Sequence, residues 1–220
     1  MIWLLAPAAI AFAVKIAVLW FSRSTFASGE SALFFRLIIV ASIHNVCEMM
    51  TFSNFLFGLS PEYLFRSYYV LTCALLCCIC AYAVEVSEIK VKGIYHLIAG
   101  ACAMIAVLVL FTDHVVAGYT AIDYSITAIK APHYWIAQIT AVSLLVSTVA
   151  FLVVGYLKAK THQTEVRCVY TLFALLPIVL CVLLVVGLMA LGAQVNGMMV
   201  IPISITLFIL VTLKTETLHR

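Results

Sequence analysis

Residues 168–191 form the sequence CVYTLFALLPIVLCVLLVVGLMAL, a run of 24 residues without a charged side chain. A helix needs about 20 mostly apolar residues to cross the hydrocarbon core of a bilayer. The segment therefore predicts a transmembrane helix. Pro177 within it removes a backbone hydrogen bond and predicts a kink, which membrane helices tolerate.

Further apolar stretches of similar length lie on either side of this run. With it, the predicted spans cover residues 2–21, 31–52, 63–86, 94–112, 134–157, 168–191 and 198–214. The short connections between them leave no room for a separate soluble domain. The sequence therefore predicts one all-α domain over residues 1–220, a polytopic membrane protein built as a bundle of seven transmembrane helices.

The composition of the whole chain agrees with a membrane location. Hydrophobic residues make up 66% of it and charged residues only 10%, with a mean hydropathy of +1.21. Soluble domains carry roughly a quarter charged residues, and no globular surface could hide this much apolar area. The net charge of +3 comes from basic residues dispersed among short loops, so we expect a lipid bilayer and no nucleic acid as partner.

The distribution of loop charge predicts the orientation. One set of loops carries most of the basic residues, namely Arg23, Lys90, Lys92, Lys158, Lys160, Arg167, Lys214 and Arg220, with Arg36 close by. The other set offers only Arg66 and Lys130. Positively charged loops stay in the cytoplasm, so we expect an N-out, C-in, multi-pass protein of the bacterial inner membrane.

The cysteines do not predict a metal or redox site. They lie in or at the edge of apolar runs, and no CxxC or His/Cys spacing falls in a loop. Small packing residues explain them, and we expect no metal and no cofactor. The histidines occupy different depths and helices, and only His44 with Glu48 approaches a cluster. No catalytic residue is predicted.

The most polar predicted span contains ASIHNVCEMM at residues 41–50. His44 and Glu48 lie four residues apart, which places them on one helix face. Arg66 has a similar predicted depth, and an ion pair between Glu48 and Arg66 would relieve both charges. Ionisable groups inside a membrane usually indicate function.

These residues suggest a ligand pocket that opens outward. Its candidate contacts from the spans and the long external loop are His44, Asn45, Glu48, Arg66, Tyr69, Asp113, His114, His133, Tyr134 and Trp135. The alternative is structural: Glu48 and Arg66 fasten two helices, while His44 bonds to a neighbouring hydroxyl or carbonyl.

Lys15 is a charge within the first predicted span. Its flexible stem favours snorkelling toward the cytoplasm. The alternative pairs it with a buried acceptor, for which Tyr82 and Glu85 are the candidates, because Glu48 is expected to lie too far outward.

Four stretches carry a family resemblance: LFRSYYVLTCALLCCICAYAVEVS (64–87), FTDHVVAGYTAIDYSITAIKAPHYW (111–135), VRCVYTLFALLPIVL (166–180) and GAQVNGMMVIPISITLFILVTLKTETLHR (192–220). Together they resemble the seven-transmembrane N-terminal sensor region of bacterial histidine kinases. In the long-loop motif, Ala131 stands where the family usually has glycine.

The resemblance implies a receptor that senses a small amphipathic ligand or the envelope. The sequence contains no kinase domain and no glycine-rich nucleotide loop, so we expect no enzyme activity and an output that passes through a separate membrane or cytoplasmic protein, unless the chain is a fragment. Expected partner contacts are Lys158, Lys160, Arg167 and Lys214.

The alternative is a non-catalytic assembly subunit of a membrane complex. Ala99, Gly100 and other small residues would permit close packing of its helices against other proteins. A homo-oligomer is compatible with both the receptor and the assembly subunit. A small transporter or channel is a lesser alternative.

Overall fold

The computed structural model describes residues 5–26, 32–56, 62–122, 125–193 and 200–218. Its elements are α1 (Ala6–Phe26), α2 (Ala32–Leu56), α3 (Glu62–Val86), α4 (Ile94–Phe111), β1 (Val116–Ile122), β2 (Ser125–Lys130), α5 (Tyr134–Leu157), α6 (His162–Ala190) and α7 (Ile201–Leu218). The fold is all-helical apart from this one hairpin, with 83% helix in seven helices over the described part of the chain.

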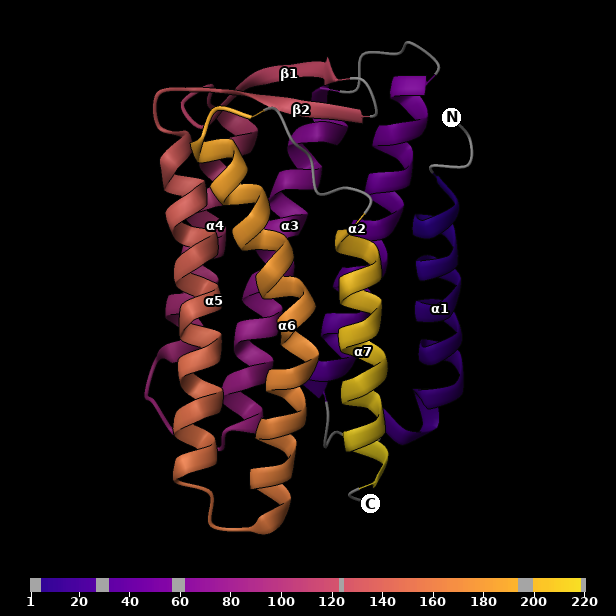
Figure 1. Ribbon diagram of the computed structural model, residues 1–220, viewed down its shortest axis with the longest axis vertical. Coiled ribbons are helices and arrows are strands. Elements are labelled where there is room, and N and C mark those ends of the chain that lie inside the picture. Colours follow the sequence, from indigo (N-terminus) through magenta and orange to yellow (C-terminus); the bar gives the residue numbers. More distant parts are fainter. Residues whose placement is uncertain (1–4, 27–31, 57–61, 123–124, 194–199, 219–220) are drawn as a thin grey trace.

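The helices run up and down through one bundle, and the hairpin of β1 and β2 lies across one end of it (Figure 1). The chain enters α1 at the hairpin end and leaves α7 at the opposite end (Figure 1). Helix α1 packs against both α2 and α7, so the first and last helices are neighbours.

Helix α3 is the central helix, because it packs against α2, α4, α5 and α6. Its side chains are accordingly buried along most of its length, from Phe65 near the start to Val86 at the end. Near its end, Phe34 of α2 and Phe208 of α7 pack against the ring of Tyr82, at centroid distances of 5.4 and 6.2 Å.

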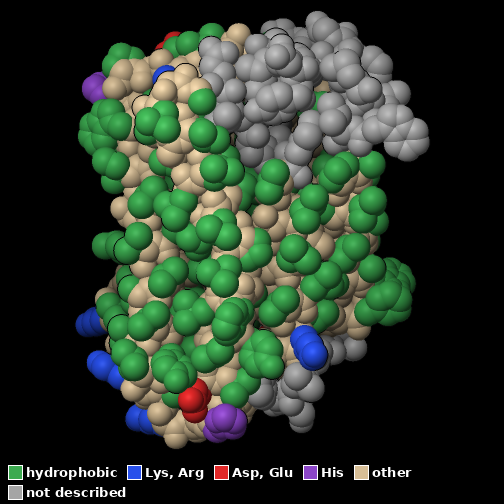
Figure 2. Space-filling view, in the orientation of Figure 1, with side chains coloured by type: hydrophobic (Ala, Val, Ile, Leu, Met, Phe, Trp, Pro, Cys, Tyr) green, Lys and Arg blue, Asp and Glu red, His purple; other side chains and the backbone are tan. Residues whose placement is uncertain are grey.

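The outer surface of the bundle is apolar, and charged side chains gather toward its ends (Figure 2). Five helices, α2 to α6, are long and apolar enough to cross a membrane, and α1 is an apolar but shorter segment over Ala6–Ser22. Helix α4 buries only Ile98, Ile105 and Val109 although nearly all its residues are apolar. A helix that is hydrophobic all round and largely exposed fits a lipid environment, which identifies a multi-pass membrane protein.

Several predicted helix boundaries differ from the observed ones. Helix α6 begins at His162, well before the predicted start at residue 168, because the Thr161 side chain caps it by accepting from the backbone N–H of Thr164. Helices α1, α2 and α7 continue to Phe26, Leu56 and Leu218, beyond their predicted ends at residues 21, 52 and 214. The predicted starts at residues 2, 31 and 198 fall outside the described residues.

The segment predicted as a long external loop contains an antiparallel hairpin instead. Strand β1 pairs with β2, and the ladder shifts register between Val116 and Gly118. The hairpin is anchored on α3 by the rings of Tyr119 and Phe65, and on α6 by Lys130, whose ammonium donates to the carbonyl of Met189. It therefore lies over the ends of the helices that line the cavity described below.

Candidate functional site

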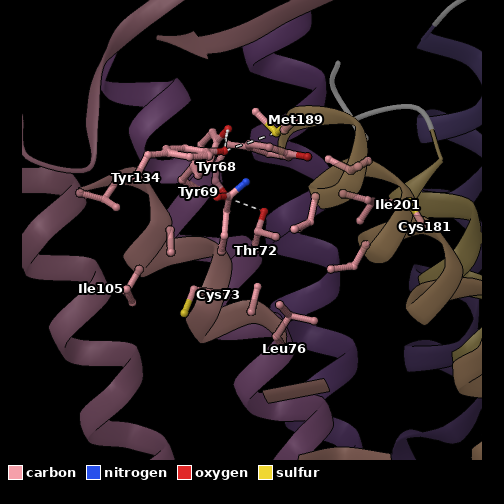
Figure 3. Close-up of a pocket in the computed structure, with 17 residues that line it drawn as sticks. Tyr68, Tyr69, Thr72, Cys73, Leu76, Ile105, Tyr134, Cys181, Met189 and Ile201 are labelled. Carbon is pink, nitrogen blue, oxygen red and sulfur yellow. Dashed lines mark hydrogen bonds between the residues drawn. The ribbon is translucent and has the colours of Figure 1, made fainter. Parts of the chain in front are cut away.

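A cavity of about 130 Å³ lies beneath the hairpin, between α3, α4, α5 and α6, with one contact from the start of α7 (Figure 3). Its polar groups come mainly from Tyr68, Tyr69, Thr72, Tyr134 and Gln138. The remaining walls are aliphatic side chains and three sulfur-bearing ones: Cys73, Leu76, Ile105, Val109, Ala137, Ala141, Cys181, Val182, Val185, Val186, Met189 and Ile201.

Two tyrosines connect the walls of the cavity at its hairpin end. The hydroxyls of Tyr69 and Tyr134 lie 3.0 Å apart, and Tyr134 also donates to the sulfur of Met189 at 3.6 Å. The chain Tyr69–Tyr134–Met189 therefore joins α3, α5 and α6 (Figure 3). A molecule entering the cavity meets hydroxyl groups at this end and aliphatic walls below.

His44 reaches the cavity only through a neighbour. Its Nε2 lies 3.0 Å from Oγ1 of Thr72, and its ring stacks on Tyr68 at a centroid distance of 5.0 Å. This bond matches the structural alternative for His44, a hydrogen bond to a nearby hydroxyl. His44 thus fixes two cavity-lining residues without lining the cavity itself.

Arg66 does not pair with Glu48, so that prediction is wrong. Arg66 is 6% exposed, and its guanidinium donates to the carboxylates of Glu62 and Asp113. It also donates to the carbonyls of Val109 and Thr112, at 2.8 and 2.9 Å. Arg66 therefore ties the start of α3 to the end of α4 and to the segment that enters the hairpin. We call Arg66, Glu62 and Asp113 the outer clamp.

Lys15 is buried, with 1% of its surface exposed, and does not snorkel. Its ammonium donates to Oδ1 of Asn45, whose own NH₂ group donates to the carbonyl of Ala8 at 2.9 Å. Glu48 lies near enough to interact electrostatically with Lys15. The hydrogen-bond partner of Lys15 is therefore Asn45, and neither Tyr82 nor Glu85, which the sequence suggested. We call Lys15, Asn45 and Glu48 the buried cluster.

Glu48 is the unusual member of the buried cluster. It is 2% exposed, and within the described part of the chain neither of its carboxylate oxygens has a hydrogen-bond partner. Since a buried polar group without a partner is costly, Glu48 is the residue of this cluster that most indicates a functional role.

The predicted ligand contacts are therefore divided in space. Tyr69 and Tyr134 line the cavity, whereas the others do not: His44, Asn45, Glu48, Arg66, Asp113, His114, His133 and Trp135. The rings of His114 and His133 face each other at 5.9 Å on the exposed rim near the hairpin. Trp135 is 53% exposed and points away from the bundle.

Sequence reasoning missed several lining residues. Gln138 is a polar residue in an apolar run and offered a signal, as did Thr72, which follows Tyr68 by one helical turn. Met189 and Cys181 offered none, because apolar runs are full of such side chains.

A second polar group lies at the opposite end of the bundle. Glu216 of α7 accepts hydrogen bonds from Tyr82 of α3 at 2.8 Å and from Arg167 of α6 at 2.5 Å. We call these three residues the inner network. Arg167 is thus engaged within the bundle, whereas the other predicted partner contacts, Lys158, Lys160 and Lys214, have exposed side chains.

Comparison of this chain with models of known protein families, with curated proteins and with solved structures finds no match.

Proposed function

We propose that this protein is a membrane sensor that binds a small amphipathic molecule in the cavity and signals through a partner protein at the opposite end of the bundle. The observation that carries the proposal is the cavity itself, apolar along its walls and closed at one end by the hydroxyls of Tyr69 and Tyr134. Ligand sites of this kind combine apolar walls with a few placed polar groups.

The size of the cavity limits the ligand. An engineered cavity of about 150 Å³ in another protein binds benzene, and the volume here is about 130 Å³. The fitting class is therefore a molecule about the size of one aromatic ring, with one hydroxyl or similar group. That group would exchange hydrogen bonds with Tyr69 and Tyr134, while the apolar part contacts Val182, Val185 and Ile105.

The helices that line the cavity also carry the inner network. Helix α3 bears Tyr69 in the cavity and Tyr82 in the network, and α6 bears Met189 in the cavity and Arg167 in the network. Pro177 lies between these two parts of α6 and removes one backbone hydrogen bond there. A small displacement of α3 or α6 at the cavity would therefore change the contacts of Glu216 on α7.

We further propose that the protein crosses a bacterial inner membrane seven times, with the hairpin on the outside of that membrane. Lys90, Lys92, Lys158 and Lys160 lie in the turns at the end opposite the hairpin, which favours a cytoplasmic location for that end. Lys158 and Lys160 are exposed there and are the best-placed contacts for a partner protein.

Single cysteines in place of His133 and Lys158, both exposed, test this orientation. We expect a membrane-impermeant maleimide to label His133→Cys in intact cells and to label Lys158→Cys only after lysis. The opposite labelling pattern would place the cavity on the cytoplasmic side and contradict an external sensor.

Filling the cavity tests ligand binding. Ala141 lines it, whereas Ala150 lies on the same helix with its side chain exposed, so Ala141→Phe and Ala150→Phe form a matched pair. Phenol and short-chain alcohols should raise the unfolding temperature of the wild type in lipid nanodiscs, because a ligand that binds only the folded state stabilises it. Ala150→Phe should respond equally, and Ala141→Phe should not respond.

Two results would contradict the sensor proposal. One is a shift in unfolding temperature that is equal, or absent, in the wild type, Ala141→Phe and Ala150→Phe for every amphipathic compound tested. The other is a partner, captured by cross-linking from Lys158 or Lys160, whose binding is indifferent to an amphipath that does bind. A ligand shifts an equilibrium only by its difference in affinity for the two states, so such indifference would leave an assembly subunit as the better explanation.

A further inference from the structure

Three free cysteines form a cluster between α3 and α4. Cys73 and Cys77 lie one turn apart on α3, and Cys102 comes from α4. Their three sulfur atoms all lie within 4.8 Å of one another. Cys77 is buried and donates to the carbonyl of Ile98 at 3.7 Å, while Cys73 and Cys102 are half-buried.

The spacing of these sulfurs approaches that of a metal site. Zinc–sulfur bonds are about 2.3 Å long, so three sulfurs around one ion lie about 4 Å apart. Small rotations of the side chains would bring all three to bonding distance. Thiolate ligands select soft ions of the zinc and copper class and not hard ions such as Mg²⁺, which need oxygen ligands.

The cluster also borders the cavity. Cys73 is one of the cavity-lining residues, and two further sulfur-bearing side chains, Cys181 and Met189, stand in the same walls. Figure 3 shows Met189 near the hairpin end of the cavity and Cys73 farther along it. An ion that loses water on entry would therefore meet sulfur atoms before it reaches the cluster.

We propose that Cys73, Cys77 and Cys102 bind one thiophilic divalent cation of the zinc and cadmium class. Two of the thiols lose their protons, which leave for water, and the third stays neutral. The ion then adds two positive charges where two protons departed, so the net charge of the site does not change. This balance matters because an isolated charge inside a bilayer is costly.

The experiment titrates the reduced full-length chain in lipid nanodiscs with Cd²⁺ alone. We expect one Cd²⁺ per chain, a thiolate-to-cadmium charge-transfer absorption band in the ultraviolet, and release of two protons into a weakly buffered solution. Cys102→Ser should abolish the band and weaken binding at least tenfold. Cys80→Ser, which changes a buried cysteine of α3 outside the cluster, should leave both unchanged.

A band that survives Cys102→Ser, or that falls equally in Cys80→Ser, would overturn the proposal. If Cys102→Ser fails to fold, maleimide labelling of the wild-type chain gives an independent readout, because bound Cd²⁺ should protect Cys73 and Cys102 from the reagent. Equal labelling with and without Cd²⁺ would again overturn it. This site does not rest on amphipath binding, and either proposal can fail without the other.

Discussion

The outer clamp and the buried cluster both place charge inside an apolar bundle, but they satisfy it differently. In the outer clamp, Arg66 has two carboxylates and two carbonyls as acceptors. In the buried cluster, Lys15 bonds to Asn45, and both oxygens of Glu48 lack a hydrogen-bond partner among the described residues. The outer clamp, whose hydrogen bonds are satisfied, therefore holds helices together. The buried cluster, whose carboxylate lacks hydrogen bonds, is the better candidate for a group that changes its contacts.

The two regions also differ in position. The outer clamp joins α3, α4 and the entry to the hairpin, and its acids Glu62 and Asp113 are largely exposed, with 53% and 78% of their side chains accessible. The buried cluster joins α1 and α2 and is shielded from water. Water can therefore replace a hydrogen bond that the carboxylates of the clamp lose. It cannot replace one lost in the buried cluster or at the two carbonyls to which Arg66 donates.

The largest effect is expected from Arg66→Met. This change removes the donor for the carbonyls of Val109 and Thr112 and leaves the clamp acids unpaired. Each carbonyl left without its donor costs about 1–3 kcal/mol, while water hydrates the largely exposed carboxylates of Glu62 and Asp113. Equilibrium unfolding in mixed detergent micelles measures the loss, and Arg66→Lys should recover part of it, since a lysine keeps the charge but not the forked geometry. Wild-type stability in Arg66→Met would show that the clamp fastens nothing.

A smaller loss is expected in the buried cluster. Lys15→Met leaves Oδ1 of Asn45 without its donor, which costs about 1–3 kcal/mol. Glu48→Gln removes only the electrostatic interaction with Lys15, because the carboxylate has no hydrogen bond to lose, so the unfolding free energy should fall less than in Lys15→Met. The double variant measures the coupling between the two residues. If Glu48→Gln proved as damaging as Lys15→Met, the contrast between clamp and cluster would collapse.

The inner network provides an intermediate case, because Glu216 accepts hydrogen bonds from both Tyr82 and Arg167. Tyr82→Phe removes one of them and leaves Arg167 in place, so we expect a loss of about 1 kcal/mol in unfolding free energy. Tyr170→Phe, a change at an exposed tyrosine of α6, is the matched control and should cost nothing measurable. Equal losses in the two variants would remove Tyr82 from the network.

The sequence predicted the helices well, because hydropathy reports a single requirement of the bilayer, the length of an apolar segment. It did not predict which charges meet. Arg66 and Glu48 were placed at similar depth, but hydropathy says nothing about the rotation of a helix about its axis. Arg66 in fact faces α4, while Glu48 faces Lys15 of α1.

The hairpin and the cavity were also beyond reach of the sequence, for different reasons. The segment with β1 and β2 lies between two long spans and was predicted only as an external loop. The contacts that hold it on the bundle, from Tyr119 and Lys130, reach helices far away in the sequence. A cavity is a volume that side chains leave unfilled. Several helices contribute to it, so no single stretch of sequence records it.

Two neighbouring residues at the start of α5, Tyr134 and Trp135, show the same contrast between a hydrogen-bonded and an exposed side chain. The effect on stability is expected to be smallest here. Tyr134 bonds to Tyr69 and Met189 at the cavity, whereas Trp135 is 53% exposed on the apolar outer surface. Trp135→Leu should therefore change the unfolding free energy by less than about 0.5 kcal/mol and leave the response to phenol intact. Tyr134→Phe should keep most of the stability but weaken the phenol response several-fold, because a phenyl ring fills the same space without a hydroxyl. Loss of the response in Trp135→Leu, with Tyr134→Phe unaffected, would move the ligand site from the cavity to the outer surface, where the sequence alone had also placed a candidate contact.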